Sequence, residues 1–297
     1  MLYSVETTSE SKEEFVKNQT NSDKGDEIKM GGAIRDPELE SAVYKAITEY
    51  CRDADISDLL MNMRLVKPST VRKKEYGDVV GLKLPRGMKR NTRLCYPKTP
   101  GDWFWCYVND EMVYRYLEDG DKEVLWMTMG YELSRIRLTL LYAEKTGRTC
   151  DAELFHTGVD GFIMQNWVEY KAEYMAMYFA WEKIKDKEAL AETVHKVTEE
   201  KLPAVLERIR AEAKKGSVQA FAETMHMIAL LHACREAYPF ELDRDVIGTM
   251  LEHYGWARML YVMFGKYTRM SEILEHLDEI KELMNNAYPA YYISGSD

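Results

Sequence analysis

Hydrophobic positions recur with helical spacing over most of the chain that follows residue 120. Asp121 is suited to be the N-cap of the first helix there, and Gly147 is a natural residue to follow its C-terminus. Helix-breaking and capping residues divide this part into segments that we expect to be helical, at 122–146, 162–185, 187–214, 217–237, 243–265 and 270–287. An earlier helix is expected at 37–63. The pattern therefore predicts a mainly helical protein.

The hydrophobic pattern changes between residues 66 and 118, where proline and glycine interrupt short apolar runs. Three of these runs have the length and composition of strands, at 79–84, 102–108 and 112–117. Asn109-Asp110 predicts a turn between the last two. We therefore expect an α+β fold that is predominantly helical, with a small antiparallel sheet preceding a helical core and a C-terminal helical extension.

The first 35 residues are rich in Ser, Thr, Glu, Lys, Asn and Gly and poor in large apolar side chains. Such a segment buries too little surface to offset its chain entropy. We expect residues 1–35 to form a disordered tail.

Bulk composition indicates a soluble globular protein, with 46% hydrophobic and 30% charged residues in 297. No run of 18 apolar residues and no basic-then-apolar start is present, so neither a membrane span nor a secretory signal is expected. The 5 cysteines are scattered and form no C-x-x-C pair. This usage favours reduced thiols and a cytoplasmic location.

Charge is distributed unevenly along the chain. The net charge of −10 argues against bulk nucleic-acid binding. Segment 64–98 is nevertheless basic, with Glu75 and Asp78 as its acidic residues. These basic residues either contact phosphates or an acidic partner, or are solvated strand and loop residues. We favour the second interpretation.

The most informative motif is Tyr131-Glu132-Leu133-Ser134-Arg135, which has the spacing of H-E-x-x-H without its histidines. A second segment, Trp167–Glu173, reads W-V-E-Y-K-A-E. Together they resemble the metallopeptidases of the ImmA/IrrE type, which occur in phages, mobile elements and bacteria. The resemblance covers roughly residues 75–185. It implies a zincin-like helical core in which Glu169 takes the place of the third zinc ligand.

The departures from that family concern the metal. Tyr131 and Arg135 replace the two zinc-binding histidines, and a guanidinium has no lone pair to offer. We therefore expect that zinc is lost, that no other cofactor is bound, and that Glu132 is a vestigial general base. If Glu132 and Glu169 still converge, Arg135 can replace the metal charge between them through forked hydrogen bonds.

Accessory candidates are Glu173 in the second motif and His156 in the loop between the two motif helices. Two E-x-x-H pairs on predicted helices, Glu192–His195 and Glu223–His226, are better explained by chance than by a di-iron site. No nucleophile elbow, P-loop or dinucleotide fingerprint is present.

The expected organisation is a zincin-like domain at 36–185 and a helical extension packed on it at 186–297. The favoured function is that of a pseudoenzyme, a non-catalytic pseudo-metallopeptidase that binds or regulates a protein partner. One alternative is a hydrolase with a site rebuilt around Glu132 and Glu169. The other is a helical interaction protein that is unrelated to zincins.

Overall fold

The structure is a computed structural model, and it describes residues 45, 47–53, 55, 57, 63–66, 92–97, 101, 104–108, 122–237 and 255–287. The expected tail at 1–35 and the strands expected at 79–84 and 112–117 lie outside these residues. Most of the basic segment 64–98 lies outside them too. The prediction of a predominantly helical chain is confirmed over the described part.

Three short strands form a mixed sheet: β1 (Met63–Val66), β2 (Thr92–Cys95) and β3 (Phe104–Val108). Their order is β1-β3-β2, with β1 parallel and β2 antiparallel to β3. An antiparallel sheet was expected, and the β1–β3 pair departs from that expectation. Parallel pairing needs a long crossover connection, and the chain between residues 66 and 104 is long enough to supply one.

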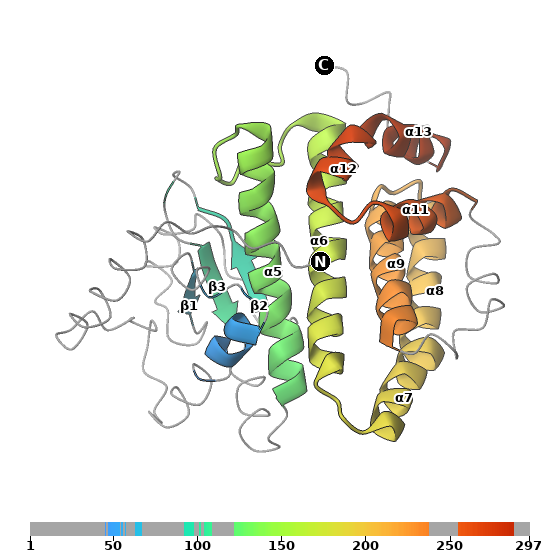
Figure 1. The fold of residues 1–297 in the computed structure, drawn as a ribbon. Coiled ribbons are helices and arrows are strands. Elements are labelled where there is room, and N and C mark those ends of the chain that lie inside the picture. The colour runs from blue at the N-terminus through green and yellow to red at the C-terminus, as the bar shows by residue number, and fades with distance from the viewer. Residues whose placement is uncertain are drawn as a thin grey trace.

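Two long antiparallel helices occupy the middle of the molecule, α5 (Lys122–Thr146) and α6 (Gly158–Glu182). The sheet lies beside α5, and α9 (Gln219–Ala237) packs on the other side of α6 (Figure 1). Beyond α9 lies α8 (Leu202–Lys214). Because neighbours cover α5 and α6 on both sides, their apolar residues are not confined to one narrow stripe.

The bounds of α5 match the prediction, and Gly147 follows it with a φ of 64°. Helix α6 begins at Gly158, four residues before its predicted start. The expected helix at 270–287 is interrupted at His276. The remaining helical segments are α7 (Lys187–Lys196), a π-helical turn at Val197–Lys201, α11 (Gly255–Lys266), α12 (Met270–Glu275) and α13 (Leu277–Ala287).

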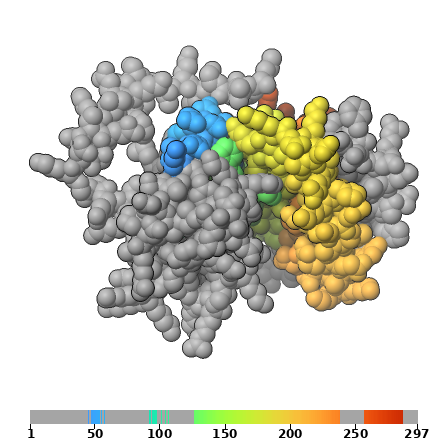
Figure 2. All heavy atoms as spheres, turned by 90° about the horizontal axis from the view of Figure 1, so that it is seen from below, coloured from blue at the N-terminus to red at the C-terminus, as the bar shows by residue number. Residues whose placement is uncertain are grey.

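The helix expected at 37–63 is shorter than predicted at its C-terminal end. Residues 47–53 are helical, Asp55 has a left-handed φ of 54°, and Met63 already belongs to β1. These helical residues, blue in Figure 2, lie beside the C-terminal end of α6. There, Lys183 Nζ donates to Asp53 Oδ2 at 2.8 Å.

The hydrophobic core is continuous from the first described helix to α13, and it crosses residue 185 without a break. Its largest fully buried side chains include Trp167 and Trp181 of α6. Gly130 of α5 permits a close approach, since a Cβ there would lie 2.5 Å from the ring of Tyr50. None of the described helices is long and apolar enough to cross a lipid bilayer.

Candidate functional site

The residues of the two motifs lie where the two central helices face each other. Tyr131, Glu132 and Arg135 come from the middle of α5, and Glu169 comes from the facing part of α6. Residues 131 and 135 are one helical turn apart, so both side chains leave α5 on the same face.

Arg135 forms a bridge between the two carboxylates. Its Nη1 donates to Glu132 Oε2 at 3.0 Å, and its Nη2 donates to Glu169 Oε1 at 3.3 Å. The contact expected between Arg135 and Glu169 is therefore present. The guanidinium joins α5 to α6, because each of its two terminal nitrogens donates to one of the two carboxylates.

Glu132 is the most buried member of the cluster, with 2% of its side chain exposed. Its second oxygen accepts a hydrogen bond of 2.7 Å from Thr92 Oγ1 on β2. Both carboxylate oxygens are therefore occupied, one by a cation and one by a hydroxyl. Such a carboxylate is held in place by its partners.

The side chain of Arg135 is 12% exposed, and its guanidinium lies among aromatic rings. Its Cζ is 5.3 Å from the ring centre of Tyr131 and 6.0 Å from that of Tyr96. Burial alone would lower the pKa of Arg135, but the negative charges of Glu132 and Glu169 oppose burial, and the pKa lies above its ordinary value. Arg135 therefore keeps its positive charge.

Tyr131 has a strongly raised pKa because it is buried, so its phenol remains protonated. A neutral phenol and a guanidinium are poor replacements for two imidazoles as zinc ligands. No group of three His, Cys, Asp or Glu side chains in the described ranges is arranged to hold a metal ion. The residues of this cluster do not fit zinc, and the cation between the two acids is the arginine itself.

Glu173 does not join this cluster. Its Oε2 lies 2.6 Å from Nδ1 of His226, which ties α6 to α9. Burial would lower the pKa of His226, but the hydrogen bond and charge of Glu173 outweigh burial and raise it. The partner of Glu173 was not predicted, because the sequence does not show that α6 and α9 are neighbours.

The Glu173–His226 pair predicts a pH-dependent part of the stability. A histidine whose pKa is raised by folding stabilises the protein fully below its ordinary pKa of about 6.5, and this stabilisation is lost as the pH rises through the raised value. We expect Glu173→Gln to lower the free energy of unfolding by roughly 0.5–1 kcal/mol at pH 6, and by less at pH 8.5.

Urea denaturation of both proteins at the two pH values measures this difference. Glu153→Gln is the matched control, because Glu153 bonds His156 at 2.8 Å on an exposed loop. It should change stability little at either pH. An equal loss for Glu173→Gln at pH 6 and pH 8.5 would contradict the role given to His226.

His156 is not brought to the charged cluster. It precedes the start of α6, whereas Glu169 lies roughly 16 Å along the axis of that helix. A rebuilt site containing His156 therefore has no geometric support in the described residues.

The members of the two E-x-x-H pairs on helices contact other residues. His195 contacts Glu199, and Glu223 accepts a hydrogen bond from Arg208.

The sequence did not identify Thr92 as a member of the site, because β2 was not predicted and a lone threonine carries no signal of its role.

In comparisons with models of known families, with curated proteins and with solved structures, nothing matches this chain.

Proposed function

We propose that this protein is a non-catalytic pseudo-metallopeptidase that acts by binding a protein partner. The observation that carries the proposal is the bridge of Arg135 between Glu132 and Glu169, at the motif positions where an active relative would hold zinc. A small sheet beside the first motif helix belongs to the layout of the resembled family, and β2 lies beside α5 here.

Arginine cannot perform the chemistry of the metal it would replace. In a zincin, the metal polarises a bound water and the motif glutamate accepts its proton. A guanidinium has no lone pair and no vacant orbital, so it neither coordinates zinc nor activates water as a Lewis acid. It can supply positive charge and directed hydrogen bonds, which hold two helices together.

The partner class follows from the resemblance alone. Active members of that family cleave repressor or regulatory proteins, and a form without catalysis would hold such a protein without cutting it. A cytoplasmic setting, in a bacterium or a mobile element, fits the cysteines, because none of the 5 forms a disulfide bond in the structure.

The metal content of the full-length protein tests the proposal. After incubation with excess zinc and exhaustive dialysis, we expect well under one zinc ion per chain, and no zinc-dependent shift in the unfolding midpoint. One retained zinc ion per chain that is lost in Glu169→Ala would contradict the proposal and favour the hydrolase with a rebuilt site. Glu153→Ala, which changes an exposed glutamate, is the matched control.

A further inference from the structure

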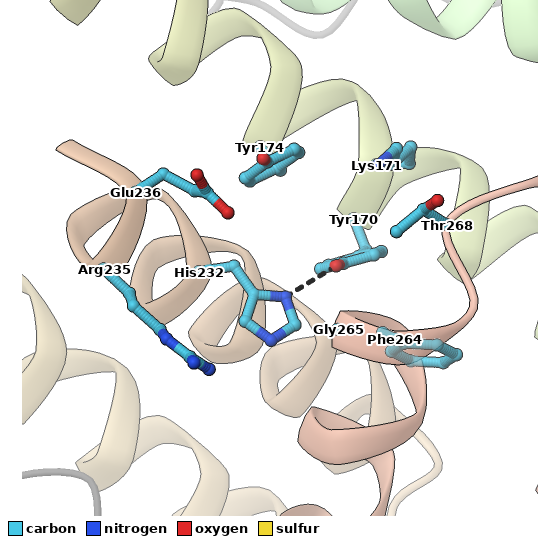
Figure 3. Close-up of a pocket in the computed structure, with 9 residues that line it drawn as sticks. All are labelled: Tyr170, Lys171, Tyr174, His232, Arg235, Glu236, Phe264, Gly265 and Thr268. Carbon is cyan, nitrogen blue, oxygen red and sulfur yellow. Dashed lines mark hydrogen bonds between the residues drawn. The ribbon is translucent and has the colours of Figure 1, made fainter. Parts of the chain in front are cut away.

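A second feature lies on another face of α6, away from Glu169. It is a pocket of about 350 Å³ between α6, α9 and α11 (Figure 3). Tyr170, Lys171 and Tyr174 line it from α6, and His232 and Glu236 line it from α9. Its volume is within the range of small-molecule sites in proteins.

The floor of the pocket is aromatic and uncharged. His232 Nε2 lies 3.1 Å from the carbonyl oxygen of Tyr261, which only accepts, so this nitrogen carries the hydrogen. Nδ1 of His232 then accepts from the hydroxyl of Tyr170 at 2.7 Å. Burial lowers the pKa of His232 to about 4, so the ring is neutral at physiological pH. Phe264 stacks on Tyr170 with ring centres 5.1 Å apart.

Two side chains of opposite charge lie above this floor, and Arg235, which also lines the pocket, donates from Nη1 to the hydroxyl of Tyr261 at 3.4 Å. The ammonium of half-buried Lys171 is 4.7 Å from the ring centre of Tyr174, and the carboxylate of Glu236 is at the exposed rim. Figure 3 draws Lys171 and Glu236 on either side of Tyr174. Neither charge forms an ion pair with another residue in the described part of the chain. Burial lowers the pKa of Lys171 to about 8, although Glu236 opposes that shift.

We propose that this pocket binds a free amino acid with an aromatic or large apolar side chain. The carboxylate of the ligand pairs with Lys171, its ammonium pairs with Glu236, and its side chain lies on the floor formed by Tyr170, His232 and Phe264. A zwitterion satisfies both charges at once, whereas a simple anion would be repelled by Glu236 and a simple cation by Lys171.

Burial explains why a ligand carboxylate would be effective at Lys171. A half-buried ammonium has lost part of its hydration, and a carboxylate that replaces those water contacts forms a charge-assisted hydrogen bond. The ligand would also contact three helices, so its binding would stabilise their packing. The inference is independent of the proposed function, because no residue of the pocket belongs to the Arg135 cluster.

Calorimetric titration of the full-length protein with four probes tests the inference. L-phenylalanine and L-leucine carry both charges, 3-phenylpropionate lacks the ammonium, and phenethylamine lacks the carboxylate. We expect at least one of the two amino acids to bind, and each single-charge analogue to bind at least about tenfold more weakly than L-phenylalanine or L-leucine, whichever binds better. The inference is overturned if neither amino acid binds, or if an analogue binds as tightly as the better amino acid.

Two variants assign the contacts to residues. Lys171→Met keeps the aliphatic stem, and we expect it to weaken binding of the amino acid about tenfold or more while leaving phenethylamine binding no weaker. Glu236→Gln lies on the surface and should fold normally; it should weaken the amino acid similarly while leaving 3-phenylpropionate no weaker. The controls are Lys187→Met and Glu192→Gln on the exposed surface of α7. Wild-type affinity in either pocket variant would overturn the assignment.

Discussion

Arg135→Met is expected to lower the free energy of unfolding by about 3–5 kcal/mol. Methionine fills similar space but leaves the carboxylate of Glu132, which is 2% exposed, without a compensating charge. Glu169 would add like-charge repulsion across the interface between α5 and α6. Urea denaturation of the wild type and the variant at pH 7 measures the loss.

Two controls separate charge burial from other effects of the substitution. Adding Glu132→Gln to Arg135→Met should recover much of the loss, because a neutral amide replaces the unpaired carboxylate. Arg137→Met removes an exposed arginine from the same helix and should stay within about 0.5 kcal/mol of the wild type. A cost below about 1 kcal/mol for Arg135→Met would show that the bridge contributes little to the fold.

The double variant Tyr131→His, Arg135→His is expected to gain a zinc site. Both positions are on one face of α5, one turn apart, and the Arg135 guanidinium already reaches Glu169 at 3.3 Å. Two imidazoles and Glu169 would then supply the three protein ligands of a zincin. The metal-free variant should be less stable than the wild type, because the bridging cation is gone.

Zinc should reverse that loss. At a free concentration one hundred times its dissociation constant, a ligand of the native state adds about 2.7 kcal/mol of stability. Thermal denaturation with and without zinc measures the gain, and the wild type should show none. The further substitution Glu169→Ala should remove most of the response. A well-folded double variant whose stability does not change with zinc would contradict a retained zincin-like framework.

The elements that were predicted well depend on local pattern. The bounds of α5 follow from its apolar spacing and from Gly147, which adopts the left-handed conformation that its position suggested. The contact between Arg135 and Glu169 was expected because the resemblance to ImmA/IrrE-type metallopeptidases implies that the two acids converge, and because buried acids need a countercharge. The bounds of α5 therefore require only local pattern, whereas the contact requires the resemblance as well as electrostatics.

Features that depend on distant pairing were not predicted. The parallel arrangement of β1 and β3 and the bond from Thr92 to Glu132 join segments about forty residues apart, which no local pattern specifies. The pocket beside Lys171 was even harder to predict from the sequence, because Tyr170 and His232 are 62 residues apart and meet only when α6 packs on α9. Read singly, these residues resemble ordinary core and surface positions.

X-ray absorption at the zinc edge of the Tyr131→His, Arg135→His variant tests most directly our proposal that Arg135 occupies the position of a lost metal. We expect two imidazole nitrogens at about 2.0–2.1 Å and carboxylate oxygen at about 2.0–2.2 Å, with the oxygen contribution reduced by Glu169→Ala. A zinc ion surrounded by oxygen alone, or a spectrum unchanged by Glu169→Ala, would contradict it.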